Sequence, residues 1–383
     1  MTQPRHSAGR RSRTPVAKAR HSRTPVAKAR QGRTPVAKTR RSRAAAPKTV
    51  TVHAHAKLNL CLAVGPKRAD GFHDLVTVFQ SISLHDTLTV SRAPRGFTLR
   101  VHHEHAEARG RASRASRRSV PAGRDNLVLR AARSLAKRLG LPGGARFTLT
   151  KRIPAQAGMG GGSADAAAAI AAMLALHGRK RSGEHLMASA LELGSDVPFV
   201  FHGGTALGMG RGEVLFPLRL RTPFRAVVAV PEWRVSTREA FLSHHRVRNG
   251  LTPWGRHLRF ARTVGRQRVE ALTLMRRGNR FEAVLGRRRR DLESLRARLR
   301  TAGLLEPHLT GSGSAVFGIV PRGASVREIV GRFLGNEPLF TVRSVGRSLR
   351  LHAHAPVTRP GKGHRADAPP RTGAGRRHRA RAS

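Results

Sequence analysis

The segment from residue 154 to residue 164, PAQAGMGGGSA, constrains the fold of this chain more than any other part of the sequence. It follows a short alternating stretch at 147–150 and leads into an alanine-rich stretch at 163–176. Four glycines in the five positions 158–162 are unfavourable for a folded backbone unless the backbone itself is used. The pattern predicts a strand, a glycine-rich loop and a helix, an arrangement whose N–H groups and helix start bind phosphate.

This loop differs from two common phosphate-binding motifs. No Gly-Lys-Ser/Thr sequence closes it, as the Walker loop requires, and its spacing and strand context differ from those of the dinucleotide fingerprint. The alternative to phosphate binding is a flexible glycine turn, and we favour phosphate binding.

Positive charge is spread over the whole chain. Its 383 residues include 74 Lys and Arg against 21 Asp and Glu, a net charge of +53. Residues 1–50 contribute +15 and residues 350–383 contribute +8, which leaves +30 for the part between them. Such charge attracts polyanions but does not specify a fold. Nucleic acid and a phosphorylated small molecule are both candidate partners.

The two ends of the chain have the composition of disordered segments. The sequence RTPVAK recurs at Arg13, Arg23 and Arg33, and a proline every ten residues prevents a continuous helix. We predict a disordered basic arm at 1–49 and a disordered basic tail at 353–383. Both would be solvated or would bind polyanions without sequence preference; an organelle transit peptide is a further alternative for the arm.

Several classes of protein are disfavoured. No apolar run approaches the ~18–20 residues of a membrane span, and the N-terminus lacks the apolar centre of a secretory signal. The single cysteine, Cys61, excludes an internal disulfide and a cysteine-based zinc site. The histidine-rich segment 102–105 has no further ligands at a readable spacing, so we predict no metal site made of protein side chains. A reducing cytoplasm fits this sequence.

Strand-like and helix-like segments alternate between the two ends, which predicts an α+β fold in two lobes. Strands are predicted at 49–65, 75–84, 86–90, 147–150, 315–320 and 339–346, with short strands across 197–230. Helices are predicted at 127–140, 163–176, 184–193, 238–247, 265–276, 279–303 and 325–334.

Six segments, in this order, resemble those of the GHMP kinase superfamily. They are AKLNLCLAVG at 56–65, RADGFHDLVTVFQSISLHDTL at 68–88, DNL at 125–127, the glycine loop at 154–165, LGSDVPFVFHGGTALGMGRGE at 193–213 and LTGSGSAVFG at 309–318. The opening AKLNL with DGFH, the triple-glycine loop and GSDVPF are together specific. Within the superfamily they are most similar to the branch that phosphorylates 4-diphosphocytidyl-2-C-methyl-D-erythritol. The resemblance covers about residues 50–352.

The resemblance implies a two-lobed GHMP kinase fold. An N-terminal ATP-binding lobe at 50–218 would resemble the second domain of ribosomal protein S5, and a C-terminal lobe at 219–352 would be ferredoxin-like. The implied activity is ATP-dependent phosphorylation of the 2-hydroxyl of 4-diphosphocytidyl-2-C-methyl-D-erythritol in the non-mevalonate isoprenoid pathway. ATP and Mg²⁺ would be required.

The resemblance also implies roles for individual residues. Asp196 would be the general base for the substrate hydroxyl, Lys57 would orient it and stabilise negative charge, and Asn59 would support the same hydroxyl. His73 would read the edge of the cytosine, with Phe72 and Phe241 stacked on its ring. The residues expected to bind ATP are Asn126 and Leu127 on the adenine side, and Pro154, Ala155, Gln156, Ala157, Gly158, Met159, Gly160, Gly161, Gly162, Ser163 and Ala164 around the phosphates.

The sequence departs from the family pattern at several places. His55 replaces a proline, Phe72 replaces the usual tyrosine, and Asn-Arg-Phe-Glu at 279–282 replaces an Asn-Asp-Leu-Glu type segment, so that one acidic residue is missing. Two alternatives therefore stay open. One is a GHMP kinase that acts on a different alcohol. The other is a basic nucleic-acid-binding protein on a degenerate kinase scaffold, although no recognition helix or aromatic RNA-binding strand supports it.

Overall fold

The computed structural model of this chain describes residues 47–104, 120–180, 184–246, 254–265 and 268–354. Most of the predicted basic arm and tail, and His105 of the histidine-rich segment, lie outside these residues. Strand β1 (Thr49–Lys67) begins, and strand β11 (Leu349–His354) ends, slightly beyond the predicted lobe limits of 50 and 352. No helix in the described part of the chain is long and apolar enough to span a bilayer.

The larger of two sheets has seven strands and is built on the long antiparallel pair of β1 and β2 (His73–Ala93). Its order is β11-β1-β2-β4-β3, with β5 paired to β2 and β6. Strand β3 runs parallel to β4, and the other pairs are antiparallel. The remaining strands are β3 (Phe97–His103), β4 (Gly144–Lys151), β5 (Thr205–Met209) and β6 (Val214–Leu218).

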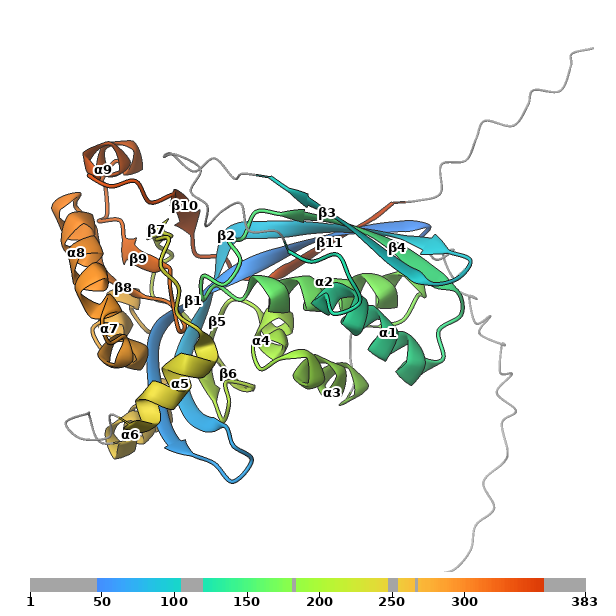
Figure 1. Cartoon of the computed structure of the whole chain (residues 1–383), viewed down its shortest axis with the longest axis horizontal. Coiled ribbons are helices and arrows are strands. Elements are labelled where there is room, and N and C mark those ends of the chain that lie inside the picture. The colour runs from blue at the N-terminus through green and yellow to red at the C-terminus, as the bar shows by residue number, and fades with distance from the viewer. Residues whose placement is uncertain (1–46, 105–119, 181–183, 247–253, 266–267, 355–383) are drawn as a thin grey trace, which may run out of the picture. The chain divides into compact units, whose positions relative to one another are not determined.

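Four helices pack below this sheet, as Figure 1 shows: α1 (Leu127–Leu139), α2 (Gly161–Leu176), α3 (Glu184–Leu193) and α4 (Val197–His202). Helix α2 contacts both β1 and β2 and is almost wholly buried. Its alanines let it lie close to the sheet, because a methyl group fills little space. This burial fixes the start of α2, and with it the glycine loop, against β1.

The second sheet has four strands in the order β10-β7-β9-β8, and Figure 1 shows α8 beside it. Leu292, Leu295 and Leu299 line one face of α8 and are fully buried in a second core. The elements of this part are β7 (Arg225–Ala229), α5 (Thr237–Arg246), α6 (Trp254–Val264), α7 (Ala271–Met275), the 3₁₀ helix η1 (Arg280–Val284), α8 (Arg288–Thr301), β8 (Leu305–Leu309), β9 (Val316–Ile319), α9 (Val326–Arg332) and β10 (Leu339–Arg343).

The predicted α+β class is confirmed, and several local predictions are wrong. The two strands predicted between 75 and 90 are one strand, β2, and the segment 197–230 includes the short helix α4. The predicted helix at 279–303 is η1 followed by α8, because Gly286 adopts a left-handed φ of 54° between them. Helix α6 was not predicted, and α7 is shorter than the predicted helix at 265–276.

Strand β11 was also missed. The sequence HAHA occurs twice in the chain, at 53–56 and at 352–355, and the pairing of β11 with β1 brings histidines of the two copies together. Strand β11 pairs with the outer edge of β1, with Thr51 opposite His352. The rings of His53 and His352 lie 5.2 Å apart, and the ring of His85 on β2 stacks on His53 at 4.7 Å. The histidines therefore form a line across three neighbouring strands.

Candidate active site

A cavity of about 650 Å³ opens between elements of the two sheets. Strands β1 and β2, the glycine loop, helix α5 and the loop between β8 and β9 all contribute to its wall. Many of the predicted site residues line it: Lys57, Asn59, Phe72, His73, Gly158, Gly160, Ser163, Asp196 and Phe241. The chain brings these together from segments that are far apart in the sequence.

Lys57 and Asp196 face each other in this cavity. The Lys57 Nζ lies 3.6 Å from the Asp196 Oδ2, and the Lys57 side chain is buried whereas that of Asp196 is 32% exposed. A Cβ at Gly160 would lie 3.1 Å from the Lys57 Cγ and 3.6 Å from the Asp196 Oδ2. The glycine loop therefore touches both members of the ion pair.

Irregularities in β1 orient its two polar residues. The register of β1 on β2 shifts between His55 and Lys57 and again between Asn59 and Cys61. Such bulges re-aim side chains that a regular strand would point elsewhere. The Lys57 N–H accordingly donates to the Met159 carbonyl at 3.0 Å, which ties the strand to the glycine loop.

Asp196 is positioned by the start of α4. It occupies the N-cap, and Pro198 follows in the first turn, where a missing N–H does no harm. Its side chain makes no capping hydrogen bond. The carboxylate is therefore available to the cavity.

Asn59 links Lys57 to the wall of the cavity. Its Oδ1 accepts a hydrogen bond from the Lys57 Nζ at 2.7 Å, and its Nδ2 donates to the Thr77 Oγ1 at 2.8 Å. Its N–H donates to the Thr310 Oγ1 at 3.0 Å. These bonds hold the ammonium group of Lys57 in one place.

The glycines of the loop serve different purposes. Gly158 and Gly160 have left-handed φ values of 78° and 72°, and a Cβ at Gly158 would lie 2.2 Å from the Thr310 carbonyl oxygen. At Gly161 a Cβ would lie 3.1 Å from the Ile153 Cγ2, and at Gly162 it would lie 3.1 Å from the Leu127 Cδ1. The first turn of α2 begins here, and its N–H groups have no partner within the helix.

A second lysine lies on the opposite side of the loop, and the sequence did not reveal it. Lys151 Nζ is buried between the carboxylates of Asp86, at 2.5 Å, and Asp165, at 2.7 Å. Asp86 also accepts the N–H groups of Arg152, at 2.6 Å, and Ile153, at 2.9 Å. A Cβ at Gly161 would lie 3.3 Å from the Lys151 Nζ, so this cluster supports the loop from below.

The protonation of this cluster follows from its burial. Burial lowers the pKa of Lys151, but Asp165 and Asp86 outweigh that effect and leave it raised. Burial raises the pKa of Asp165 well above its ordinary value despite the nearby ammonium group. The Asp165 Oδ1 is buried and has no hydrogen-bond partner within the described structure. Burial of the cluster thus favours the protonated form of Asp165 more than an exposed aspartate would experience.

Aromatic rings form the far end of the cavity. The ring of Phe241 stacks on that of His73 at 5.5 Å and meets Phe281 edge-on at 4.9 Å. The Nδ1–H of His73 donates to the Gly65 carbonyl at 3.0 Å, which fixes the orientation of the imidazole. Phe72 is half exposed at the mouth of the cavity, and the guanidinium group of Arg211 lies 4.6 Å from its ring centre.

Other predicted ATP-binding residues lie outside the wall of this cavity. Asn126 caps α1: its Oδ1 accepts the Val128 N–H at 2.9 Å and its Nδ2 donates to the Pro121 carbonyl at 2.7 Å. Leu127 contacts the glycine loop at Gly162. The residues of the loop that do not line the cavity are Pro154, Ala155, Gln156, Ala157, Met159, Gly161, Gly162 and Ala164.

Two residues of the smaller-sheet part hold the opposite wall and were not predicted. The Asn279 Nδ2 donates to the carbonyl groups of Leu309 and Gly311, at 2.9 and 2.8 Å. The Glu282 Oε1 accepts the Leu309 N–H at 2.9 Å, and burial raises the pKa of Glu282. The sequence drew attention to segment 279–282 only for the one acidic residue that is missing from it, not for Asn279 or Glu282.

Within the described residues, no three His, Cys, Asp or Glu side chains are grouped so as to hold a metal ion. The cavity does offer oxygen donors, among them Asp196 and Ser163. Mg²⁺ takes oxygen ligands and commonly binds through one or two protein groups together with phosphates of the substrate. These residues fit a magnesium ion that arrives with a nucleotide.

Comparison with known proteins identifies the family. The model of the GHMP kinases N terminal domain matches residues 126–204. A protein of Moorella thermoacetica named 4-diphosphocytidyl-2-C-methyl-D-erythritol kinase is 38% identical over 294 residues, which cover 76% of this chain and 96% of that protein. One of the same name from Salinispora arenicola is 47% identical over 208 residues, 53% of this chain, and the match spans only 62% of its length.

Solved structures agree with these matches. A crystal structure of 4-(cytidine 5'-diphospho)-2C-methyl-D-erythritol kinase is 34% identical and covers 77% of this chain and 99% of its own, with a TM-score of 0.60. Mevalonate kinase of L. major is 15% identical, with a TM-score of 0.54 and coverage of 76% and 94%, and shares the fold. The predicted two-lobed GHMP kinase fold is confirmed.

Proposed function

This chain belongs to the 4-diphosphocytidyl-2-C-methyl-D-erythritol kinase family, and we propose that it transfers the γ-phosphoryl group of ATP to the 2-hydroxyl of that diphosphocytidyl alcohol, a step of the non-mevalonate isoprenoid pathway. The observation that carries the proposal is the Lys57–Asp196 pair, 3.6 Å apart in a cavity that also contains the glycine loop and the aromatic end. A cavity of this size suits a small molecule.

The proposed mechanism starts from the ion pair. Asp196 accepts the proton of the substrate hydroxyl, and Lys57 orients that hydroxyl and stabilises the charge that develops on its oxygen. Phosphoryl transfer depends mostly on positioning and charge neutralisation, which Lys57 and the loop N–H groups supply.

The two substrates would enter from different sides of Gly160. The glycine loop would hold the phosphates of ATP at the start of α2, with Asn126 and Leu127 toward the adenine. Mg²⁺ would be held by phosphate oxygens with Ser163 or Asp196, and it would neutralise phosphate charge. Asn59 would contact the substrate hydroxyl from the opposite wall.

The aromatic end supports a cytosine pocket. Phe241 stacked on His73 offers a ring face and a ring edge, and Phe72 at the mouth offers a second face. Stacking of a base on an aromatic ring contributes about 1–3 kcal/mol. Phe72 lacks the hydroxyl of the usual tyrosine, and its contact with Arg211 holds the ring in the absence of that group.

A coupled assay of ADP formation by the full chain tests this proposal. ADP should form only when 4-diphosphocytidyl-2-C-methyl-D-erythritol is present, and ³¹P NMR should find the new phosphate on the 2-hydroxyl. Mevalonate and homoserine serve as competing alcohols. Faster turnover of either one would favour another GHMP kinase activity, and substrate-independent hydrolysis would contradict the proposal.

The nucleic-acid-binding alternative has less support. A degenerate scaffold would have no need for the Lys57–Asp196 pair or for the hydrogen bonds that fix Lys57. Polyanion binding by the basic ends remains a proposal about residues that the structure does not describe. We expect the reaction to take place in the cytoplasm, where the buried thiol of Cys61 would stay reduced.

A further inference from the structure

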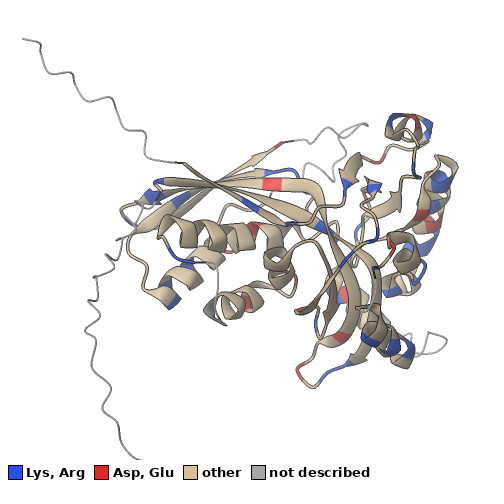
Figure 2. Cartoon of the chain, turned by 180° about the vertical axis from the view of Figure 1, so that it is seen from behind, with Lys and Arg blue, Asp and Glu red and all other residues tan. Residues whose placement is uncertain are grey.

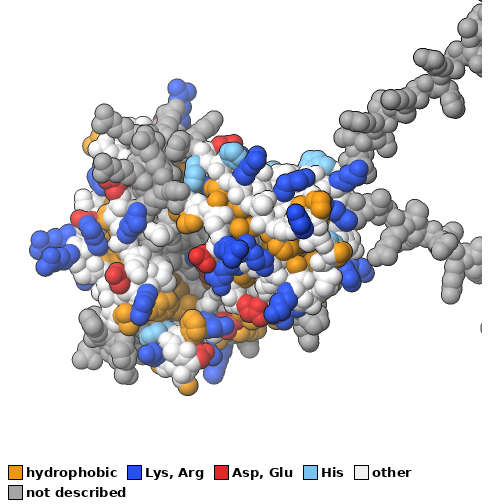
Figure 3. Space-filling model, turned by 45° about the vertical axis from the view of Figure 1, so that its right-hand side comes forward, with side chains coloured by type: hydrophobic (Ala, Val, Ile, Leu, Met, Phe, Trp, Pro, Cys, Tyr) orange, Lys and Arg blue, Asp and Glu red, His pale blue; other side chains and the backbone are white. Residues whose placement is uncertain are grey.

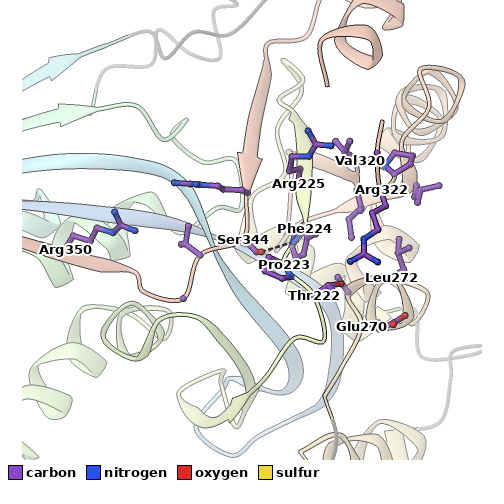
Figure 4. A pocket seen from close by; sticks show the side chains of 18 residues that line it. Thr222, Pro223, Phe224, Arg225, Glu270, Leu272, Val320, Arg322, Ser344 and Arg350 are labelled. Atoms are coloured by element: carbon purple, nitrogen blue, oxygen red, sulfur yellow. Dashed lines mark hydrogen bonds between the residues drawn. The ribbon is translucent and has the colours of Figure 1, made fainter. Parts of the chain in front are cut away.

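A second cleft, of about 670 Å³, lies away from the catalytic cavity and shares none of its lining residues. Its wall comes from β7, β9 and β10 of the smaller sheet, from α7, and from Arg350 on β11 of the larger sheet. Figure 4 shows Arg225, Arg322 and Arg350 around it. Like the catalytic cavity, the cleft joins the two sheets.

Four arginines and one acidic residue line this cleft: Arg225, Arg322, Arg343, Arg350 and Glu270. Glu270 lies 3.4 Å from Arg221, which is outside the cleft. Among the described residues no carboxylate lies within ion-pair distance of any of the four arginines. Arg225 is held by a hydrogen bond to the Ala324 carbonyl at 2.8 Å. The cleft therefore concentrates positive charge that the described chain does not neutralise.

The rest of the cleft is apolar or neutral. Its apolar side chains include Phe224, Leu272, Leu305, Ile319 and Val320. Ser344 is fixed beside them, because its Oγ accepts the Phe224 N–H at 3.0 Å and its own N–H donates to the Phe224 carbonyl at 2.9 Å. A cleft lined by both apolar side chains and guanidinium groups suits a ligand with an apolar part and an anionic part.

We propose that this cleft is a second binding site, for a phosphorylated small molecule. Guanidinium groups bind phosphate oxygens through paired hydrogen bonds, and Arg225, Arg322 and Arg343 supply them from three separate segments. The volume lies within the range of about 300–1,000 Å³ of small-molecule sites. An occupant would contact residues from both sheets, as a ligand in the catalytic cavity would. The inference does not depend on the proposed function.

General basicity alone does not account for this cleft. Figures 2 and 3 show Lys and Arg over many surfaces of the chain, helix α8 among them. Many arginines elsewhere meet an acidic partner, such as Arg298 with Glu337 at 2.6 Å and Arg276 with Glu306 at 3.0 Å. The cleft arginines differ because they line one cleft together with apolar side chains and have no acidic partner among the described residues.

Calorimetric titration of the full chain with inorganic pyrophosphate tests the inference. Arg322→Gln removes one charge from the cleft, and Arg327→Gln removes one from the exposed surface of α9 as a matched control. We expect Arg322→Gln to weaken pyrophosphate binding at least fivefold and Arg327→Gln to leave it unchanged. Turnover without pyrophosphate should be the same in both variants, since neither residue lines the catalytic cavity.

Three results would overturn the inference. Equal weakening by the two substitutions would mean that only net charge matters. Loss of binding in Lys57→Met, with retention in Arg322→Gln, would place pyrophosphate in the catalytic cavity. Absence of any saturable binding to the wild-type chain would also exclude the site. A parallel titration with inorganic phosphate distinguishes a monophosphate site from one that needs two phosphate groups.

Discussion

Two lysines lie on opposite sides of the glycine loop, next to neighbouring glycines, and their surroundings differ. Lys57 borders Gly160 and reaches a partly exposed aspartate across the cavity, 3.6 Å away. Lys151 borders Gly161 and is buried against two aspartates at 2.5 and 2.7 Å. The same pair of residue types therefore stands in two environments, one open to ligands and one closed.

This difference indicates a catalytic role for the Lys57–Asp196 pair and a structural role for the Lys151 cluster. A base has to reach its substrate, so a carboxylate that is 32% exposed and a lysine held by Asn59 suit catalysis. A buried ion pair whose partners have no access to ligands can only position the backbone around it, and removing one member leaves an uncompensated charge. Substitutions on the cavity side should thus alter turnover, and substitutions on the buried side should alter stability.

The largest expected effect is on the cavity side. Asp196→Asn keeps the shape of the side chain but removes the base, so kcat should fall by about 10²–10⁴ with little change in melting temperature. Steady-state kinetics and thermal denaturation of the same preparation measure both quantities. Wild-type turnover in the folded variant would mean that Asp196 is not the base. The proposed difference between the Lys57 side and the Lys151 side of the loop would then fail.

Substitution of the buried lysine should have the opposite signature. Lys151→Met leaves the buried Asp86 without its ammonium partner, and breaking a buried pair in this way typically costs about 3–5 kcal/mol. Denaturant unfolding measures this loss. Lys57→Met is the matched control, since it should reduce kcat strongly and stability much less. Equal losses of stability in the two variants would show that both lysines are structural.

How far the sequence alone predicts the molecule differs between these two sides. Lys57, the glycine loop and Asp196 each lie in a local motif, so the cavity side could be predicted. The buried cluster joins Asp86 on β2, Lys151 at the end of β4 and Asp165 in α2, and only the packing of α2 on the sheet brings them together. No local pattern indicates such a contact.

The same reasoning applies to the fold. The alternation of residues predicted β1 and the alanine run predicted α2, because each of these features is local in the sequence. The bulges that aim Lys57, and the pairing of β11 with β1, depend on partners distant in sequence. Asn279 was missed as a support of the loop at 309–311 for this reason, since its hydrogen-bond partners Leu309 and Gly311 lie 30 and 32 positions away in the sequence.

Adjacent glycines offer a finer comparison. Alanine at Gly160 would be strained at φ 72° and would press on Lys57, so Gly160→Ala should lower kcat about tenfold. Alanine at Gly161 meets Ile153 at 3.1 Å, and Gly161→Ala should mainly reduce stability, by about 1–3 kcal/mol. Kinetics and melting curves of both variants decide this. A larger loss of turnover in Gly161→Ala than in Gly160→Ala would mean that the Lys57 side of the loop is not the one that determines turnover.

The smallest effect is expected at Asp165, and it tests the protonation of the buried cluster. Asparagine resembles a protonated carboxyl group, so Asp165→Asn should change stability at neutral pH by less than about 1 kcal/mol. Asp86→Asn should cost several times as much, because an amide Nδ2 in place of the Asp86 Oδ2 cannot accept the hydrogen bond of the buried Lys151 ammonium group. Because the raised pKa of Asp165 means that the folded state binds a proton that the unfolded state releases, its contribution to stability declines as the pH rises above about 4. Unfolding measured from pH 4 upward should therefore show a decline in wild type that Asp165→Asn removes. A decline of the same size in the variant would mean that Asp165 is not the group whose pKa is raised on folding.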